Sequence, residues 1–320
     1  MSRNIIGVYY EHPRWFEPLF AEMDRRGTPY VRLLAQEHFY EPGRTTDDVG
    51  LVFNRMSPSA YRREHGSGIL YTLNYLQHLE ANRVRVVNGS PAFRCEISKA
   101  LQLTMLHQLG LPFPKARVIH RSEDAVKAAE GLRFPVVVKP NVGGSGAGVV
   151  RFNSLDELRQ RTSNVPLDLG LDSVGLVQEF IPARGGHITR VEILDGKFLY
   201  AIKVFLTGET FDLCPADICR TTEGVALENS CPVEAPKAGL RVEGFTPPAD
   251  VIQSVERILS EAGIEVGGVE YIIDDRDGQL YYYDINALSN FVAGAEQVVG
   301  LNPFSLLVDF LEQEAARVGR

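Results

Sequence analysis

The stretch from Phe134 to Phe152 constrains the fold of this chain more than any other part of its sequence. Three consecutive valines lead to Lys139, a pattern typical of a buried strand that carries one cation at its end, and Pro140 is expected to stop that strand. A loop with four glycines in six residues follows, and a second strand is expected to begin at Val149. The sequence therefore predicts a hairpin with a lysine before its glycine-rich tip.

This glycine loop favours contact with an anionic ligand. Glycine accepts positive φ and lets the backbone approach a ligand closely, so the loop can direct several N–H groups at phosphate oxygens. The pattern is not a Walker P-loop, which needs a helix behind it, and not a Rossmann fingerprint, because a strand follows the glycines. An ordinary hairpin with an exposed lysine is the alternative. The candidate phosphate-binding residues in this stretch are Lys139, Gly143, Gly144, Ser145, Gly146 and Gly148.

The bulk composition narrows the class of protein. With 320 residues, 44% of them hydrophobic, the chain can bury a large core and is expected to form two or three domains. A formal net charge of −8 argues against nonspecific binding to nucleic acid or to an anionic membrane. The N-terminus becomes charged too soon for a signal peptide, and no segment has the roughly eighteen apolar residues of a membrane span. A cytoplasmic location is expected.

The four cysteines are too few and too scattered for a disulfide framework. Cys214 and Cys219 frame four residues, which is not a usual zinc spacing, and no histidine cluster accompanies them. Free thiols are therefore favoured over a metal or redox role.

The first part of the chain has a βαβ rhythm that predicts a parallel sheet with helices on its faces. Three arginines, Arg55, Arg62 and Arg63, occupy the polar loop after the third strand, where ligands of α/β sheets tend to bind. They are candidates to hold a carboxylate, with a solvated surface as the alternative. The expected elements are strands Ile5–Tyr10, Tyr30–Leu34, Gly50–Asn54 and Arg85–Asn88, helices from about Trp15 to Met23 and from Ile69 to Ala81, and a linker at Asn88–Pro91.

A small α/β unit of about sixty residues is expected between Arg117 and Gln178, with its own core and the character of a mobile lid. Two alternating strands around Asp195-Gly196 then give a strong hairpin signal. Residues 206–246 read as irregular. The other expected helices are Ser98–Leu109, Glu123–Gly131, Ser154–Arg161, Ala249–Ala262 and Asn302–Arg317.

A second informative stretch is an acidic hairpin in which Asp284 and Asn286, two residues apart, share one face. A two-residue turn would place Glu270 opposite Ile285 and turn its side chain away. A three-residue loop with Gly278 left-handed would place Glu270 opposite Asp284. We favour the second register, because two carboxylates and one amide oxygen on one face suit Mg²⁺. A surface hairpin with solvated acids is the alternative.

Together these residues resemble the ATP-grasp superfamily, and most closely its RimK-type carboxylate–amine ligases; glutathione synthetase is a more distant relative. The resemblance covers nearly the whole chain and implies an α/β fold that becomes α+β in its C-terminal part. Residues 1–95 would form a parallel α/β domain, 96–180 a linker helix and lid, and 181–320 a C-terminal antiparallel-sheet domain. ATP would be held between the lid and the C-terminal domain.

The resemblance also implies roles for individual residues. Lys99 and Lys139 would contact the nucleotide phosphates, and the glycine loop would close over the terminal ones. Lys203 would face the transferred phosphoryl group and Arg190 the substrate. The segment expected to hold adenine comprises Gln178, Glu179, Phe180 and Ile181; the metal triad comprises Glu270, Asp284 and Asn286; and the candidate substrate contacts are Arg55, Arg62, Arg220, Ser289 and Asn290.

The sequence departs from the family pattern in three places. The triad more often runs Asp, Glu, Asn, so the two carboxylates have exchanged length here. The segment Arg184–Thr189 lacks an acidic residue often found before the arginine, and Phe211–Arg220 does not match the usual substrate loop. Substrate specificity is therefore not transferred from the family.

The expected activity is ATP-dependent formation of a carbon–nitrogen bond between a carboxylate and an amine through an acyl phosphate, with release of ADP and phosphate. The cofactors would be ATP and Mg²⁺, expected as two ions, with Mn²⁺ as a substitute. The partners would be amino acids or peptides rather than nucleic acid or membrane. The sequence leaves open whether the chain forms a homo-oligomer. A non-catalytic ATP-binding regulator and a kinase that stops at phosphoryl transfer are the alternatives.

Overall fold

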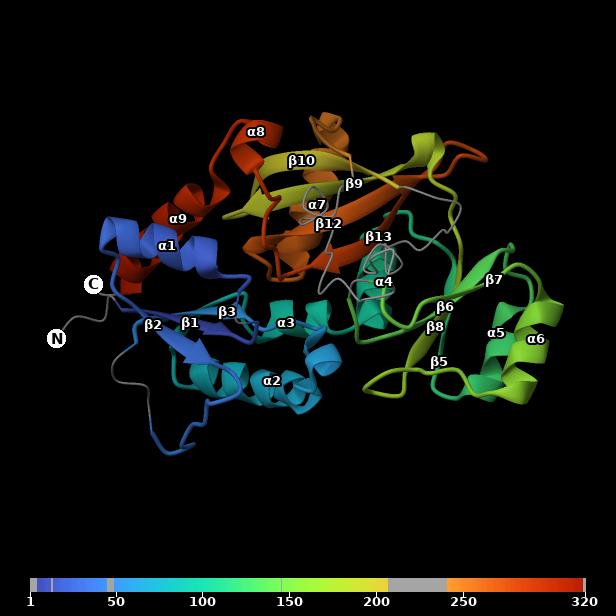
Figure 1. Ribbon diagram of the computed structural model, residues 1–320, viewed down its shortest axis with the longest axis horizontal. Coiled ribbons are helices and arrows are strands. Elements are labelled where there is room, and N and C mark those ends of the chain that lie inside the picture. The colour runs from blue at the N-terminus through green and yellow to red at the C-terminus, as the bar shows by residue number, and fades with distance from the viewer. Residues whose placement is uncertain (1–4, 13, 45–48, 145, 207–240, 319–320) are drawn as a thin grey trace, which may run out of the picture.

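The computed structural model describes residues 5–12, 14–44, 49–144, 146–206 and 241–318, and it arranges their strands in three sheets (Figure 1). The N-terminal sheet has the strand order β2-β1-β3-β4 and is parallel throughout, as predicted. Its central strands β1 and β3 are buried along their whole length, as expected for a parallel sheet with helices on both faces. The strands are β1 (Ile6–Tyr10), β2 (Tyr30–Leu34), β3 (Leu51–Arg55) and β4 (Arg85–Val87).

Two helical layers cover this sheet. Apolar residues of α1 and of the C-terminal helix α9 share one core with β1 and β3, and residues of α2 pack on the opposite face. The helix α9 therefore returns to the N-terminal sheet from the far end of the chain (Figure 1). The helical elements here are α1 (Glu17–Arg26), η1 (Ala60–Arg63), α2 (Gly66–Ala81), α3 (Ser90–Glu96) and α9 (Pro303–Val318).

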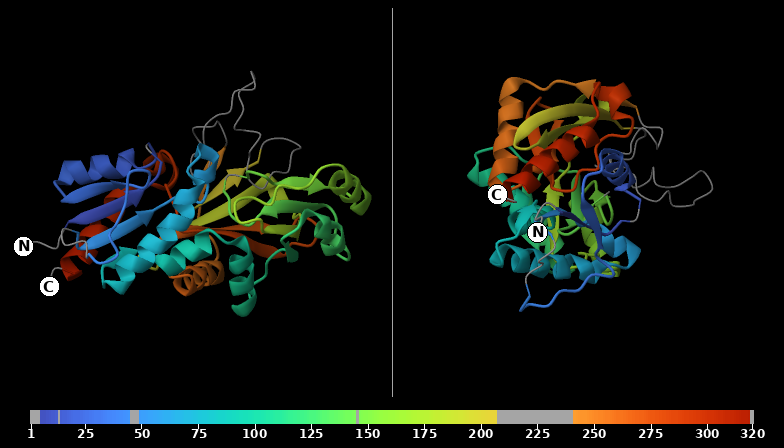
Figure 2. Two further views of the ribbon diagram at one scale, coloured as in Figure 1. Left: turned by 90° about the horizontal axis from the view of Figure 1, so that it is seen from below. Right: turned by 90° about the vertical axis from the view of Figure 1, so that its left-hand side faces the viewer.

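The segment predicted to be a lid, called the lid below, contains a four-stranded sheet of order β5-β8-β6-β7 with its own apolar core. Helices α5 and α6 pack on one face, and the sheet lies at the end of the molecule away from the N-terminal sheet (Figure 2). Antiparallel pairing of β6 with β7 confirms the predicted hairpin around the glycine loop. The elements are β5 (Ala116–Ile119), η2 (Ser122–Asp124), α5 (Ala125–Ala129), β6 (Val136–Pro140), β7 (Val150–Phe152), α6 (Leu155–Asn164) and β8 (Gly175–Glu179).

The third sheet is antiparallel, with the order β11-β10-β9-β12-β13. The β9–β10 hairpin turns at Asp195 and Gly196, which both have positive φ, as the sequence signal predicts. Helices α4 and α7 share a core with one face of this sheet. The elements are α4 (Lys99–Gln108), η3 (Arg184–Gly186), β9 (His187–Leu194), β10 (Lys197–Phe205), β11 (Val242–Phe245), α7 (Ala249–Glu261), β12 (Val266–Ile273), β13 (Leu280–Asn286) and α8 (Ala295–Val299).

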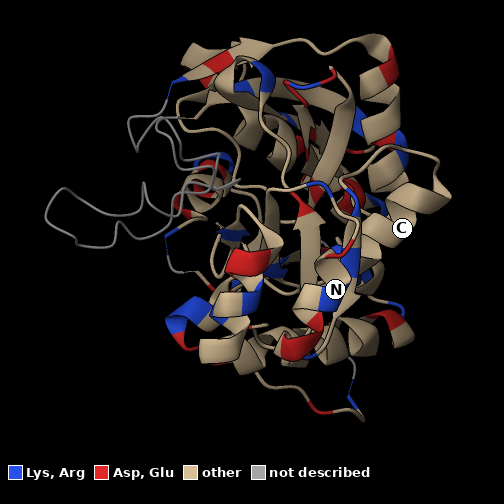
Figure 3. Ribbon diagram, turned by 90° about the vertical axis from the view of Figure 1, so that its right-hand side faces the viewer, with Lys and Arg blue, Asp and Glu red and all other residues tan. Residues whose placement is uncertain are grey.

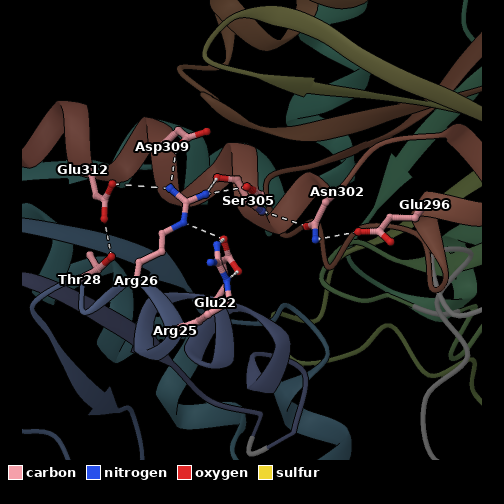
Figure 4. A network of polar contacts seen from close by, with 9 residues as sticks. All are labelled: Glu22, Arg25, Arg26, Thr28, Glu296, Asn302, Ser305, Asp309 and Glu312. Atoms are coloured by element: carbon pink, nitrogen blue, oxygen red, sulfur yellow. Dashed lines mark hydrogen bonds and ion pairs between the residues drawn. The ribbon is translucent and has the colours of Figure 1, made fainter.

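A polar cluster fastens α9 to α1 (Figure 4). The Arg26 guanidinium donates to Glu22 on its own helix, to Asp309, and to the carbonyl and hydroxyl of Ser305, at 2.5–2.8 Å. Thr28 donates to Glu312 on the next turn of α9. The last helix of the chain is therefore tied by charge as well as by apolar packing to the first.

Several elements differ from the prediction. The predicted linker at Asn88–Pro91 was wrong, because Ser90 and Pro91 begin helix α3 and proline is tolerated in a first turn. Strand β11 lies in the stretch that read as irregular, and α8 was not predicted. Ser145, Cys214, Cys219, Arg220 and Cys231 lie outside the described residues.

The predicted domain boundaries stay a prediction; α4 shares one core with the C-terminal sheet and with Leu176 on lid strand β8. No helix within the described part of the chain is long and apolar enough to cross a bilayer.

Candidate active site

Alternation along the lid strands turns Lys139 away from the lid core. Val136 and Val138 on the same strand pack into that core, so Lys139 and Val137 lie on the opposite face of the sheet. Gln178 on β8 is paired with Val137 and therefore shares that face. Burial lowers the pKa of Lys139 to about 7, and the positive charge of Lys99 adds to this effect. The lid thus presents a buried, easily deprotonated cation on the face away from its own helices.

The glycine loop runs from this lysine toward the N-terminal domain. Gly146 and Gly148 have φ of +67° and +73°, a conformation that favours glycine. A Cβ atom on Gly143 would stand 3.2 Å from the hydroxyl of Tyr61, and one on Gly148 would stand 2.8 Å from Cγ of Pro140. The loop is therefore packed closely at Gly143 and Gly148, where a larger side chain would force a neighbour to move.

The acidic hairpin places Glu270 opposite Asp284, as predicted, but for another reason. The turn spans four residues, 275–278, rather than the predicted three; Asp274 accepts from Gly278 and pairs with Gln279. Gly278 is left-handed, with φ of +80°, as predicted. The register is corrected farther along by a bulge, in which Tyr283 is the extra residue.

The two carboxylates are held by cations and a phenol. Glu270 accepts from the Tyr283 hydroxyl at 2.7 Å and from Nη1 of Arg190 at 3.1 Å. Asp284 accepts from Nζ of Lys99 at 2.6 Å and from Nδ2 of Asn286 at 3.3 Å. Lys99 therefore neutralises Asp284, and Arg190 neutralises Glu270.

The environment shifts the two acids in opposite directions. Burial and the charge of Asp284 raise the pKa of Glu270. Burial also raises the pKa of Asp284, but the Lys99 ammonium outweighs it, so the pKa of Asp284 lies below its usual value. Two carboxylates that repel each other at close range favour a bound cation between them.

The donor set of this hairpin fits Mg²⁺. Two carboxylates and one amide oxygen are hard donors, and Mg²⁺ typically takes one or two protein carboxylates and completes its shell with phosphate and water. No group of three His, Cys, Asp or Glu side chains suited to a metal ion occurs among the described residues. The predicted set differs from such a group in that its third donor is the amide of Asn286. One pocket joins this hairpin to the lid; it is lined by Lys99, Lys139, Pro140, Gly143, Gly144, Gly146, Ala147, Val149, Glu270, Tyr283 and Asp284.

Behind the pocket lies a network of buried charges. Arg190 is fully buried, and its Nε donates to Glu192 at 2.5 Å while Nη1 donates to Glu270. Glu192 lies so close to Gly268 that a Cβ there would stand 2.9 Å from its Oε2 atom. In the view of Figure 3, acidic and basic positions are interspersed along the ribbon. Arg190, Glu192 and Glu270 form a buried charge network beside the pocket.

Arg55 links the N-terminal sheet to the loop after β13. It is 2% exposed, and Nη2 donates to the carbonyl of Ser289 and, at 3.2 Å, to Oδ1 of Asn290. Burial lowers the pKa of Arg55 to about 9. Neither Nε nor Nη1 of Arg55 has a hydrogen-bond partner within the described ranges. Arg55, Ser289 and Asn290 are thus brought together, whereas Arg62 is exposed.

The structure does not bring Lys203 to this site. Its strand neighbours Ile202 and Val204 share the face of Arg190 and Glu270, because Ile202 is paired with Arg190. Lys203 is paired with Thr189 and lies on the opposite face, with Nζ 4.2 Å from the centre of the Phe245 ring. The alternation of a strand therefore separates Lys203 from the carboxylates.

The segment expected to hold adenine passes from the lid to the C-terminal sheet. Gln178 is fully buried, and neither of its amide atoms has a hydrogen-bond partner in the described part of the chain. Glu179 accepts from the Arg133 amide at 2.9 Å, and the Phe180 ring lies 4.8 Å below the Arg151 guanidinium. Ile181 packs into the core of the N-terminal and C-terminal sheets.

Sequence reasoning missed four residues of this region. Tyr61, Tyr283, Glu96 and Glu192 lie in or behind the pocket, and Tyr283 had a local signal, the run of three tyrosines before Asp284. Strand alternation could also have placed Glu192 beside Arg190, two residues earlier on β9. Tyr61 and Glu96 reach the site through tertiary packing, which no local pattern reports.

Comparisons with known proteins agree with this arrangement. Residues 97–209 match the model of the RimK-like ATP-grasp domain. A D-alanine–D-alanine ligase of Geobacter sulfurreducens is 30% identical over 209 residues, 64% of this chain and 59% of that protein. The α-aminoadipate–LysW ligase LysX of Sulfurisphaera tokodaii is 29% identical over 184 residues, 55% of this chain and 61% of that protein. The chain therefore matches about three fifths of the length of these relatives.

A solved structure extends the likeness over nearly the whole chain. The ATP-grasp ligase PsnB, complexed with a minimal precursor, superposes with a TM-score of 0.65 at 17% identity. The superposition covers 97% of this chain and 99% of PsnB.

Proposed function

We propose that this chain, which has the ATP-grasp fold and carries a RimK-like ATP-grasp domain in residues 97–209, is an ATP-dependent carboxylate–amine ligase. One observation carries the proposal: a single pocket joins the lysine and glycine loop of the lid to the carboxylates of the β12–β13 hairpin. The first half suits phosphate and the second suits the metal that accompanies it.

Glu270, Asp284 and Asn286 are the residues that would hold Mg²⁺, expected as two ions. Bound there, the metal would neutralise charge on the transferred phosphoryl group. Lys99 and Lys139 would contact the phosphates, and the N–H groups of the glycine loop would cover the terminal one. In the free protein Lys99 pairs with Asp284, so the proposal requires Lys99 to exchange that carboxylate for phosphate oxygen.

The proposed ligation proceeds in two chemical steps. An oxygen of the substrate carboxylate attacks the γ-phosphorus of ATP, and the bond from that phosphorus to the ADP oxygen breaks, which gives an acyl phosphate and ADP. The amine nitrogen then attacks the acyl carbon, phosphate leaves, and the amine loses a proton. Because two anions meet in the first step, the fixed cations Lys139 and Arg190 stabilise the charge that develops.

The lid has a further role in this scheme. An acyl phosphate is lost if water reaches it, and closure of the lid would exclude water while the amine attacks. The separate core of the lid sheet supports movement of the lid as a unit.

The substrates are proposed to be amino acids or peptides. The relatives carry names of enzymes that join D-alanine to D-alanine or α-aminoadipate to LysW, and PsnB is complexed with a precursor. Arg55, Ser289 and Asn290 are joined by hydrogen bonds and are the residues we assign to the substrate side. We assign no phosphate contact to Lys203.

The proposal is tested by incubation with ATP, Mg²⁺ and a panel of amino acids and short peptides. ADP release that needs both an acid and an amine, with a new amide detected by mass, supports ligation. A phosphorylated acid without an amide indicates a kinase. ATP binding without turnover across the panel indicates a regulatory protein. The Glu270→Gln/Asp284→Asn variant is the control and is expected to lose turnover.

A further inference from the structure

Strand β13 carries two of the proposed metal ligands at the edge of its sheet. Asp284 and Asn286 flank Ile285, and β13 has β12 as its only neighbour among the strands of the described residues. The outer N–H and C=O groups of an edge strand have no ladder partner and need another one when buried. The position of the metal ligands therefore depends on what pairs with this edge.

The side chain of Gln102 supplies that partner. From helix α4, its Nε2 donates to the carbonyl of Ile285 at 2.8 Å, and its Oε1 accepts from the amide of Ile285 at 3.3 Å. Nε2 also donates to the carbonyl of Cys95 at 3.0 Å, and Gln102 is 2% exposed. One side-chain amide thus makes the two hydrogen bonds that a facing residue of a further antiparallel strand would make.

Neighbouring groups extend this support past the end of the strand. Glu96 accepts from the amide of Ala287, and Asn88 donates to the carbonyl of the same residue at 2.7 Å. The backbone is therefore held at Ile285 by Gln102 and at Ala287 by two other side chains, with Asn286 between them.

The same helix also reaches the site directly. Lys99 lies three residues before Gln102, so the two side chains are neighbours on one face of α4. Lys99 contacts the carboxylate of Asp284 while Gln102 holds the backbone of the next residue. Helix α4 therefore sets the distance between a proposed phosphate contact and the proposed metal ligands.

We propose that Gln102 is a positioning residue for the metal site, because its amide replaces a missing strand and fixes Asp284 and Asn286 in place. The inference rests on the proposed function, in which those residues hold Mg²⁺. Groups that orient metal ligands typically change metal affinity by about 10- to 100-fold when they are removed.

The test replaces Gln102 with methionine, which has a similar length and no hydrogen-bonding amide. The Mg²⁺ concentration that gives half-maximal strengthening of ATP binding, measured by calorimetry, is expected to rise about 10-fold or more. ATP binding without Mg²⁺ is expected to change less than about twofold, since the lid is untouched. Hydrogen exchange at the Ile285 amide is expected to accelerate.

Thr104→Val on the same helix is the matched control. It removes one side-chain hydrogen bond, to the Ala100 carbonyl, without touching β13, so it should behave as the wild type in every measurement. If Gln102→Met fails to fold, Gln102→Glu keeps the acceptor for the Ile285 amide and loses the donor, and the same rise in the Mg²⁺ midpoint is expected.

Two results would overturn the inference. One is a folded Gln102 variant with the wild-type Mg²⁺ midpoint; the other is an equal loss of ATP binding with and without Mg²⁺, which indicates general loosening. The Asp284→Asn variant distinguishes failure of the positioning role of Gln102 from failure of the proposed metal site. If Asp284→Asn leaves the midpoint unchanged, the proposed function is wrong; if it raises the midpoint and the Gln102 variants do not, only the positioning role is wrong.

Discussion

Lys139 has the most unusual surroundings of any single cation beside the pocket. It is buried, it lies near a second lysine, and burial brings its pKa to about 7. A lysine of this kind changes charge within the range in which most enzymes are studied. In the proposed site, its ammonium form is the one that attracts phosphate.

ATP affinity is therefore expected to fall as the pH rises above 7. In the free protein Lys139 then loses its proton, whereas bound ATP favours the protonated ammonium. The affinity for ATP can therefore fall by up to about tenfold per pH unit. Titrations with ATP between pH 6 and pH 9 measure this slope. Lys139→Arg keeps its proton over the whole range and should flatten the profile. Equal slopes in the two proteins would contradict a role for Lys139 as the titrating group.

Arg190 is the cation on which the buried acids depend most. Arg190 donates hydrogen bonds to both Glu192 and Glu270, and all three residues are at most 3% exposed. Arg190→Met should lower the free energy of unfolding by about 3–5 kcal/mol, because it leaves buried carboxylates without their cation. Denaturant unfolding measures the change. Arg44→Met, which removes an exposed pair with Glu41, should change it by less than about 1 kcal/mol; comparable losses in both variants would show that burial of the pair is irrelevant.

At the scale of elements, the hairpin of β12 and β13 shows how far local patterns predict structure. Alternation correctly placed Asp284 and Asn286 on one face, and the Gly278 signal correctly placed a left-handed residue in the turn. The predicted loop was one residue too short, and a bulge at Tyr283 compensates for it. The bulge has no local signal in the sequence; in the folded chain the Tyr283 hydroxyl donates to Glu270.

Lys203 illustrates the opposite failure. Its assignment came from a resemblance in sequence order, and a shift of one residue along a strand reverses the face on which a side chain lies. Pairing with Thr189 places Lys203 on the face away from Arg190. The register of the β9–β10 hairpin shifts by one residue between Phe198 and Tyr200, and this bulge, which the motif does not report, turns Lys203 to the other face.

The polar contacts between α1 and α9 are expected to stabilise the packing of these two helices. Arg26→Ala removes donors to Glu22, Asp309 and Ser305, and the Arg26 side chain is only 16% exposed. We expect a loss of about 1–3 kcal/mol in the free energy of unfolding. Arg25→Ala is the control, since Arg25 pairs only with Glu22 among the described residues and is largely exposed. Equal midpoints of thermal unfolding for the two variants would contradict the stabilising role of Arg26 between α1 and α9.

For the whole molecule, local patterns predicted the parallel N-terminal sheet, the small α/β unit and most helices. The resemblance to the ATP-grasp superfamily implied the antiparallel C-terminal sheet, which the structure confirms. The sequence did not predict how these parts meet. Arg55 reaching Ser289 and Asn88 reaching Ala287 join residues about two hundred positions apart, and only the folded chain brings them together. The pocket is likewise assembled from α4, the lid and β13.

Because the pocket is formed by both the lid and β13, both segments are expected to respond when a nucleotide binds. A non-hydrolysable ATP analogue with Mg²⁺ should slow amide exchange both at Gly143 and Gly144 in the lid and along β13, because one ligand would contact both. Helix α6 on the far face of the lid is the internal reference and should not change. Protection confined to one of the two halves would contradict a shared site.

The most direct test of the account is the Mg²⁺ dependence of ATP binding in the wild type and in the Glu270→Gln/Asp284→Asn variant. The central claim is that the lid contributes phosphate contacts and the hairpin contributes the metal. Calorimetry with and without Mg²⁺ should therefore show that Mg²⁺ strengthens ATP binding to the wild type. The double variant should keep binding without Mg²⁺ and lose the strengthening. Equal strengthening by Mg²⁺ in both proteins would contradict the claim.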